Sequence, residues 1–114
     1  MTLRQVVAAL GLEVITGQGA LEREVTGGYA SDLLSCVMAR ARAGNVWVTL
    51  QAHANVVAVA SLLGLAAVII GEGVRPDPAT CQKAEAEAVV LLATPRTTYA
   101  TVERLAALGI SAGE

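Results

Sequence analysis

The chain has 114 residues, of which 54% are apolar and 16% are charged, and its net charge is −2. This length matches one domain of typical size and leaves no room for a second hydrophobic core. The eight basic residues are scattered along the chain, which excludes the basic stripe that neutralises nucleic-acid phosphates, so no nucleic-acid partner is expected.

The first predicted element is a helix from Leu3 to Leu10, where apolar residues recur at helical spacing. Thr2 precedes it as a favoured N-cap, and Gly11 follows it as a terminator that accepts the left-handed conformation. We expect one face of this helix to pack on the rest of the domain.

Two short runs of β-forming residues follow the helix, from Leu12 to Thr16 and from Leu21 to Thr26. The sequence Gly17-Gln18-Gly19 between them has the composition of a turn. The two runs therefore predict a small hairpin or strand pair.

A second helix is predicted after the pair Gly27-Gly28. Ser31 or Asp32 is a suitable N-cap for it, and Gly44 is a suitable end. Its predicted buried stripe consists of Leu34, Val37, Met38 and Ala41.

From residue 46 onward, strands and helices alternate at a spacing of roughly 20 residues, which is the pattern of βαβ crossovers. Asp77-Pro78 places an N-cap before a proline at the first helical position, and Gly109 follows the last periodic residue. We predict one α/β domain over residues 1–114, a three-layer βα repeat whose mostly parallel central sheet is flanked by helices. The predicted elements are strand Val46–Leu50, helix Ala54–Leu63, strand Ala67–Ile70, helix Pro78–Glu87, strand Val89–Ala93 and helix Thr98–Leu108.

The segment from Asn45 to Gly71 lacks acidic and basic residues, so a membrane span has to be considered. Polar side chains interrupt its first half, and the apolar run Val56–Gly71 is shorter than the ~20 residues that a spanning helix needs. Cys36 and Cys81 lie far apart without CxxC spacing, and no export signal follows Met1. We therefore expect no membrane span, free buried thiols and a cytoplasmic location.

A group of hydrogen-bonding side chains follows the first of these strands. In parallel sheets, ligands bind beyond the carboxyl ends of the strands, where helix N-termini present free N–H groups. One interpretation is a small-molecule pocket, in which His53 exchanges a hydrogen bond and Asn55 binds an amide or ring edge. In the other interpretation, His53 or Asn55 caps the next helix and the remaining side chains satisfy buried backbone groups. The group consists of Thr49, Gln51, His53 and Asn55.

Two further groups of candidates are expected at the same edge. Tyr29, Ser31 and Asp32 follow a glycine pair that permits close approach of an anion or nucleotide, although a plain turn with an N-cap has the same sequence. Residues 71–73 and 94–97 form ordinary loops or, through the arginine of the second, contact a phosphate. The candidate ligand-binding residues are Tyr29, Ser31, Asp32, Thr49, Gln51, His53, Asn55, Gly73 and Thr94.

No complete catalytic set is visible in the sequence. The one lysine, Lys83, has no glycine-rich loop before it, so the sequence lacks a phosphate-binding P-loop. One histidine and two distant cysteines lack the spacing of a metal site, and no Gly-x-Ser-x-Gly motif is present. A transferase or hydrolase would need Cys36 or Ser31 to lie beside His53 in the fold. We expect neither enzymatic activity nor a metal or cofactor.

Three stretches carry a family pattern: Gly27-Gly28-Tyr29-Ala30-Ser31-Asp32-Leu33-Leu34-Ser35, Trp47-Val48-Thr49-Leu50-Gln51-Ala52-His53-Ala54-Asn55 and Gly73-Val74-Arg75-Pro76-Asp77. With them the chain resembles the DRTGG domain family, especially its short stand-alone members, from about Leu3 to Ile110. The resemblance implies a fold similar to the N-terminal domain of bacterial HPr kinase/phosphorylases. Such domains also accompany CBS domains in regulatory regions, where some members bind adenine nucleotides, and they tend to dimerise.

The chain departs from the longer family members at two places. It has Gln51-Ala52-His53 where they have Gly-Asp-Arg, and Gly71-Glu72-Gly73 where they have Thr-Gly-Gly. The main hypothesis is a non-catalytic regulatory module that binds a ligand, an adenine nucleotide, as a homodimer, since a charged fraction well below ~25% leaves little polar surface for a monomer. The alternative is a scaffold subunit that docks a partner protein, such as a kinase or metabolic enzyme, without a small-molecule ligand.

Overall fold

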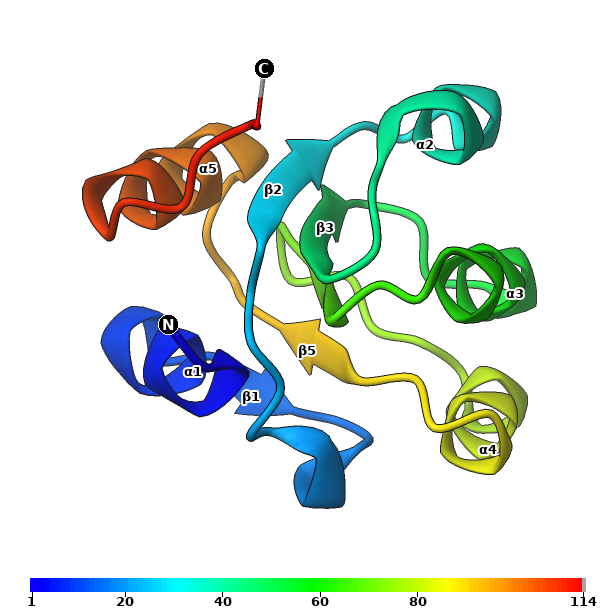
Figure 1. Ribbon diagram of the computed structural model, residues 1–114. Coiled ribbons are helices and arrows are strands. Elements are labelled where there is room, and N and C mark those ends of the chain that lie inside the picture. Colours follow the sequence, from blue (N-terminus) through cyan, green and yellow to red (C-terminus); the bar gives the residue numbers. More distant parts are fainter. Residues whose placement is uncertain (114) are drawn as a thin grey trace.

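The computed structural model describes residues 1–113, in which helices and strands alternate (Figure 1). From residue 46 onward, every predicted element is confirmed within one or two residues. The helices are α1 (Leu3–Leu10), α2 (Leu34–Arg40), α3 (Ala54–Leu63), α4 (Pro78–Ala86) and α5 (Thr98–Ala107), with a short 3-10 turn η1 (Gln18–Ala20). The strands are β1 (Glu13–Val14), β2 (Gly27–Ala30), β3 (Asn45–Thr49), β4 (Ala67–Ile70) and β5 (Leu91–Ala93).

The five strands form one sheet in the order β1-β5-β4-β3-β2. Strands β2 to β5 are parallel to one another and follow each other in chain order. Strand β1 adds to the far edge in the antiparallel sense, with Glu13 opposite Ala93. The prediction of a mostly parallel sheet is therefore confirmed.

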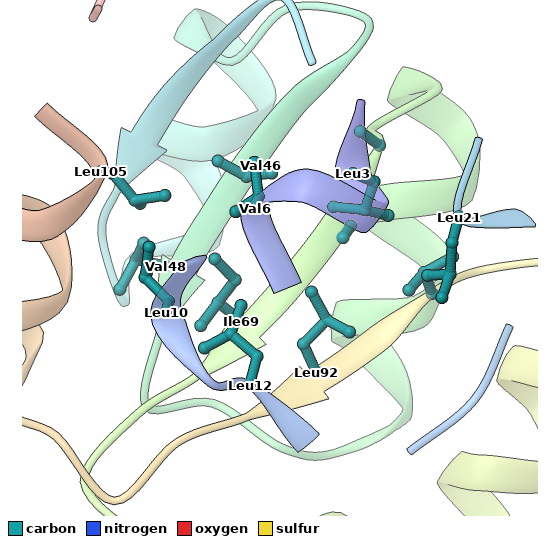
Figure 2. Close-up of a cluster of buried hydrophobic side chains, with 13 residues drawn as sticks. Leu3, Val6, Leu10, Leu12, Leu21, Val46, Val48, Ile69, Leu92 and Leu105 are labelled. Carbon is teal, nitrogen blue, oxygen red and sulfur yellow. The ribbon is translucent and has the colours of Figure 1, made fainter. Parts of the chain in front are cut away.

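Helices cover both faces of the sheet (Figure 1). Helices α2, α3 and α4 connect successive parallel strands and lie on one face, and α1 and α5 lie on the other. Alternate side chains of β3 enter the two layers, since Val46 and Val48 belong to the cluster under α1 and α5, and Trp47 to the cluster under α2 to α4. Figure 2 shows the first cluster, in which side chains of α1 and α5 cover those of β3, β4 and β5. The three-layer prediction is confirmed.

The ends of the helices carry the signals that the sequence indicates. Thr2 and Gln5 bond to each other's backbone N–H in a capping box at the start of α1, and Gly11 ends this helix with φ 64°. Helix α3 ends at Gly64, and the Asp77 carboxylate accepts a hydrogen bond from the Thr80 N–H at 2.7 Å to cap α4. The signals that set these boundaries lie within a few residues of each helix end, so a single sequence predicts them well.

The predicted hairpin of residues 12–26 is wrong. The first run pairs with β5 instead, and the Thr16 hydroxyl donates to the Val89 carbonyl at 2.8 Å and accepts from the Leu91 N–H at 3.0 Å. The second run bonds to the N-terminus, where the Leu3 N–H donates to the Arg23 carbonyl at 2.8 Å. Both runs find distant partners because a bent segment with the 3-10 turn η1 replaces the turn predicted at Gly17-Gln18-Gly19.

The prediction around the glycine pair is also wrong in part. Gly27 and Gly28 belong to the edge strand β2, and a Cβ on Gly27 would lie 2.9 Å from the Ser111 carbonyl oxygen, so the pair admits the C-terminal segment. Leu33 is the N-cap of α2 and makes no side-chain cap, and the helix ends at Arg40 before reaching Gly44. The predicted stripe is wrong at Met38, which is 42% exposed, because the seven-residue helix buries only a narrow side, at Val37, against the sheet.

The two cysteines are free, as predicted, but the prediction that they are buried is wrong. Cys36 on α2 and Cys81 on α4 are both partly exposed, since each helix buries only one narrow side against the sheet. None of the helices that residues 1–113 form has the length and apolar character to cross a membrane.

Ala88 adopts a backbone conformation that disfavours a side chain, with φ 56°. For a residue with a Cβ, this conformation costs roughly 1–2 kcal/mol of folding free energy, which glycine would not incur. Glycine is also more flexible in the unfolded chain, and this entropy cancels part of the gain. We expect Ala88→Gly to raise the free energy of unfolding by about 0.5 kcal/mol in urea denaturation. The matched change Ala58→Gly inside α3 should lower it by about 1 kcal/mol, and a loss of stability in both variants would contradict the expectation.

Candidate functional site

Asp32 is the centre of a hydrogen-bond cluster at the carboxyl edge of the sheet. Its Oδ1 accepts from the Thr49 hydroxyl at 2.8 Å and from the Leu50 N–H at 2.7 Å. The Gln51 side chain donates to the Asp32 carbonyl at 3.2 Å, and the Gln51 N–H donates to the Thr49 hydroxyl oxygen at 3.1 Å. Three predicted site residues therefore come together, and their bonds to one another fasten the loop after β2 to the loop after β3.

Ser31 and Tyr29 lie beside this cluster but serve the surrounding structure. The Ser31 hydroxyl accepts from the Leu33 N–H at 3.1 Å, and the Ser31 carbonyl accepts from the indole N–H of buried Trp47 at 2.8 Å. Tyr29 is half-buried against the core under α2 and α3. Ser31 thus positions the loop, and Tyr29 belongs partly to the core.

His53 and Asn55 are the candidates with free side chains. Both are exposed, and His53 is the N-cap of α3 without a side-chain cap bond, so the interpretation of His53 as a side-chain cap is wrong. The neighbouring helix α2 also starts without a side-chain cap, at Leu33. The first N–H groups of a helix lack partners within the helix, so these two adjacent starts present donors and partial positive charge at the sheet edge.

Glu72 has a role that the sequence reading missed. Its carboxylate accepts from the Thr98 N–H at 3.2 Å and thereby closes the N-terminus of α5, and its backbone has φ 59°. The Arg96 guanidinium, a predicted phosphate contact, instead donates to the Leu10 carbonyl at the end of α1. The sequence signal for this role was an acidic residue between two glycines at the carboxyl edge. Such a residue can place its carboxylate at a helix N-terminus, where an anion would otherwise bind.

Gly73 and Thr94 lie at a separate place on the edge. The Gly73 N–H donates to the Thr94 carbonyl at 3.1 Å, and both residues line a shallow cavity of about 450 Å³ together with Glu13 and Arg75. The Arg75 guanidinium donates to both Glu13 oxygens, at 2.6 and 2.8 Å. This hydrogen bond lowers the pKa of Glu13 and raises the pKa of Arg75, so the pair stays ionised and brings no net charge to the cavity.

The cap at Asp77 makes stability depend on pH. Hydrogen bonds from Thr80 lower the pKa of Asp77, so its contribution is present above the unfolded-state pKa and is lost as the pH falls through the folded-state pKa. We expect Asp77→Asn to lose melting temperature less steeply than the wild type between about pH 5 and about pH 2, because asparagine caps without titrating. Circular dichroism melts across this range measure both slopes, and equal slopes would contradict the assignment.

The structure thus divides the nine candidates among several places. Asp32, Thr49 and Gln51 form one bonded cluster with Ser31 beside it, while the exposed pair His53 and Asn55 stands at the start of α3. Tyr29 also lies beside the cluster, half-buried against the core, whereas Gly73 and Thr94 lie at a separate place on the edge. Within residues 1–113, no group of three or more His, Cys, Asp or Glu side chains is placed to hold a metal ion.

Comparisons with known proteins agree with this fold. The family model of the DRTGG domain matches residues 5–108. A solved structure of the CBS and DRTGG domains from the regulatory region of Clostridium perfringens pyrophosphatase, complexed with the activator diadenosine tetraphosphate, matches with a TM-score of 0.69 and 15% identity. The match covers 98% of this chain and 48% of that one, so the chain spans about half of its length, and at this identity it shows a shared fold. No curated protein sequence matches the chain. The family match extends over most of the chain, from α1 to the end of α5, and confirms that the chain belongs to the DRTGG domain family.

Proposed function

We propose that this domain is a non-catalytic regulatory module that binds an adenine nucleotide. Membership of the DRTGG family carries the proposal. The matched structure, which belongs to a regulatory region and was solved with a dinucleotide activator, supports the choice of ligand.

The proposed site lies at the carboxyl edge, between the starts of α2 and α3. The uncapped N–H groups there would donate hydrogen bonds to phosphate oxygens, and the exposed side chains of His53 and Asn55 would reach the ligand from α3. The Asp32 cluster behind them holds the two loops in place. By contrast, the starts of α4 and α5 are occupied by Asp77 and Glu72, which makes them poor places for a second anion.

The test is a thermal-shift series with ATP, AMP and diadenosine tetraphosphate. Ligand at ~100 times its Kd should stabilise the fold by about 2.7 kcal/mol. We expect His53→Ala and Asn55→Ala to reduce the shift at equal ligand concentration. Gln82→Ala, an exposed polar residue on α4 away from the edge, should leave it unchanged. The absence of a shift in the wild type with every nucleotide would overturn the proposal.

We further propose that the module works as a cytoplasmic homodimer. The low charged fraction supports self-association, and two free cysteines are in keeping with a reducing compartment. Sedimentation velocity over a range of concentrations tests the dimer, and a monomer at every concentration would contradict it.

A protein-docking role is the second candidate, and exposed apolar side chains favour it. Leu33 is 61% exposed and Leu62 is 71% exposed. Leu33 at the start of α2 and Leu62 on α3 would contact a partner that covers the layer of α2, α3 and α4. Leu62→Ser, in the last turn of α3 and away from the proposed nucleotide site, should then weaken partner binding while leaving the nucleotide shift unchanged.

A further inference from the structure

An apolar cavity of about 380 Å³ opens between α5 and the outer edge of β2. Small residues create it, because Gly28 and Ala30 on β2 and Ala106 on α5 do not fill the space. Its size lies within the range of small-molecule sites, about 300–1,000 Å³. Figure 2 shows two of the larger side chains of its wall, Val48 and Leu105, on β3 and α5. The larger apolar lining residues are Val48, Val102, Leu105 and Ile110.

A second cavity of about 330 Å³ adjoins the first along the same edge. The two share Tyr29 and Ala112, and the second is completed by Arg40 and Arg42 at the end of α2. The C-terminal segment reaches this edge from α5 (Figure 1), and the Gly28 N–H donates to its Ser111 carbonyl at 3.0 Å. A ligand at this edge would therefore meet an apolar hollow and a basic hollow side by side.

The charge of the second cavity is uncompensated within residues 1–113. Arg4 and Arg75 form ion pairs, and Arg23 donates to backbone carbonyls. Arg40 and Arg42 have neither kind of partner within this part of the chain. The dipole of α2 favours a cation near its end, but two guanidinium groups beside a hollow also make a site for an anion.

We propose that the two cavities form one ligand site for an organic anion with an apolar body, such as an aromatic or aliphatic carboxylate, sulfonate or phosphate ester. The apolar body lies between β2 and α5, and the anionic group lies at Arg40 and Arg42. Burial of the apolar body supplies most of the binding free energy, and the arginines select the charge. This site is separate from the start of α3 and does not depend on the nucleotide proposal.

The test uses 8-anilinonaphthalene-1-sulfonate, which combines an apolar ring system with an anion. We expect saturable fluorescence enhancement with the folded wild type, displaced by decanoate. Ala106→Phe fills the apolar cavity, and the double variant Arg40→Gln with Arg42→Gln removes the charge, so each should weaken binding about tenfold. The matched controls are Ala107→Phe and Arg104→Gln, which lie on α5 outside both cavities and should bind like the wild type.

Several results would overturn the proposal. These are the lack of saturable binding to the wild type, or equal losses in the two phenylalanine variants. Another is unchanged binding by the double arginine variant, which keeps the test valid if Ala106→Phe fails to fold. If sedimentation shows that Ala106→Phe dissociates a dimer while dye binding persists, the cavity is an interface between copies instead. The absence of a nucleotide shift in the wild type bears only on the nucleotide proposal, so the two failures are distinguishable.

Discussion

Trp47→Ala is expected to lower the free energy of unfolding by about 3–5 kcal/mol. The side chain is fully buried between β3 and the helices α2 and α3, and its indole N–H donates to the Ser31 carbonyl at 2.8 Å. The substitution removes a large apolar volume and leaves that carbonyl without its partner. Since a domain of this size is stabilised by about 5–15 kcal/mol in total, much of the stability should be lost. Urea denaturation followed by far-ultraviolet circular dichroism measures it, because the variant lacks the tryptophan fluorescence signal.

Tyr99→Ala provides the aromatic control for this substitution. Tyr99 is 84% exposed on α5, so its truncation should change the free energy of unfolding by less than about 0.5 kcal/mol. Similar losses in the two variants would show that Trp47 does not hold the core together.

Gly17→Ala is expected to destabilise the fold by about 3 kcal/mol. Gly17 has φ 83°, and a Cβ there would lie 2.6 Å from Val90 Cγ2 and 3.0 Å from Val90 Cα. The left-handed conformation costs roughly 1 kcal/mol for alanine. The collision with a fully buried neighbour adds about 1–3 kcal/mol, because the Val90 backbone, directly before β5, is held by a hydrogen bond from the Val68 N–H and cannot move aside.

Gly11→Ala separates the two contributions. Gly11 has φ 64°, and a Cβ there would meet nothing within 4 Å, so only the conformational cost of about 1 kcal/mol applies. The difference between the two variants in urea denaturation measures the collision alone. A larger loss at position 11 than at position 17 would contradict this account.

The regular half of the fold is predictable because its signals are local. Helix α3 and strand β4 have the predicted bounds, since a helical apolar pattern ended by Gly64 and a short run of β-branched residues need no distant information. The Asp77-Pro78 start of α4 follows from the same kind of signal. Alternation of such elements then implies a parallel sheet with helices on both faces.

The remainder depends on contacts that a pattern does not encode. Strand β2 escaped prediction because Gly27 and Gly28 have low β-propensity, and their place in the sheet is set by register with Asn45 and Val46. The rule that polar loops gather at the carboxyl ends of parallel strands brought Asp32 and Thr49 to the same edge correctly, because Asp32 follows β2, Thr49 ends β3 and these strands lie side by side. It could not show that they would bond to each other and leave His53 exposed. Hydrogen-bond partners are a property of packed loops and require coordinates.

The antiparallel addition of β1 to β5 has a consequence for the order of assembly. Each parallel pair from β2 to β5 joins neighbours in the chain, whereas Glu13 meets Ala93 and Thr16 meets Leu91 only after almost the whole chain has been traversed. Closing so long a loop costs more chain entropy than closing the short ones, so the N-terminal segment should dock after the four parallel strands have condensed. In native-state hydrogen exchange, the amides of residues 13–16 should then open at lower free energy than those of β3 and β4.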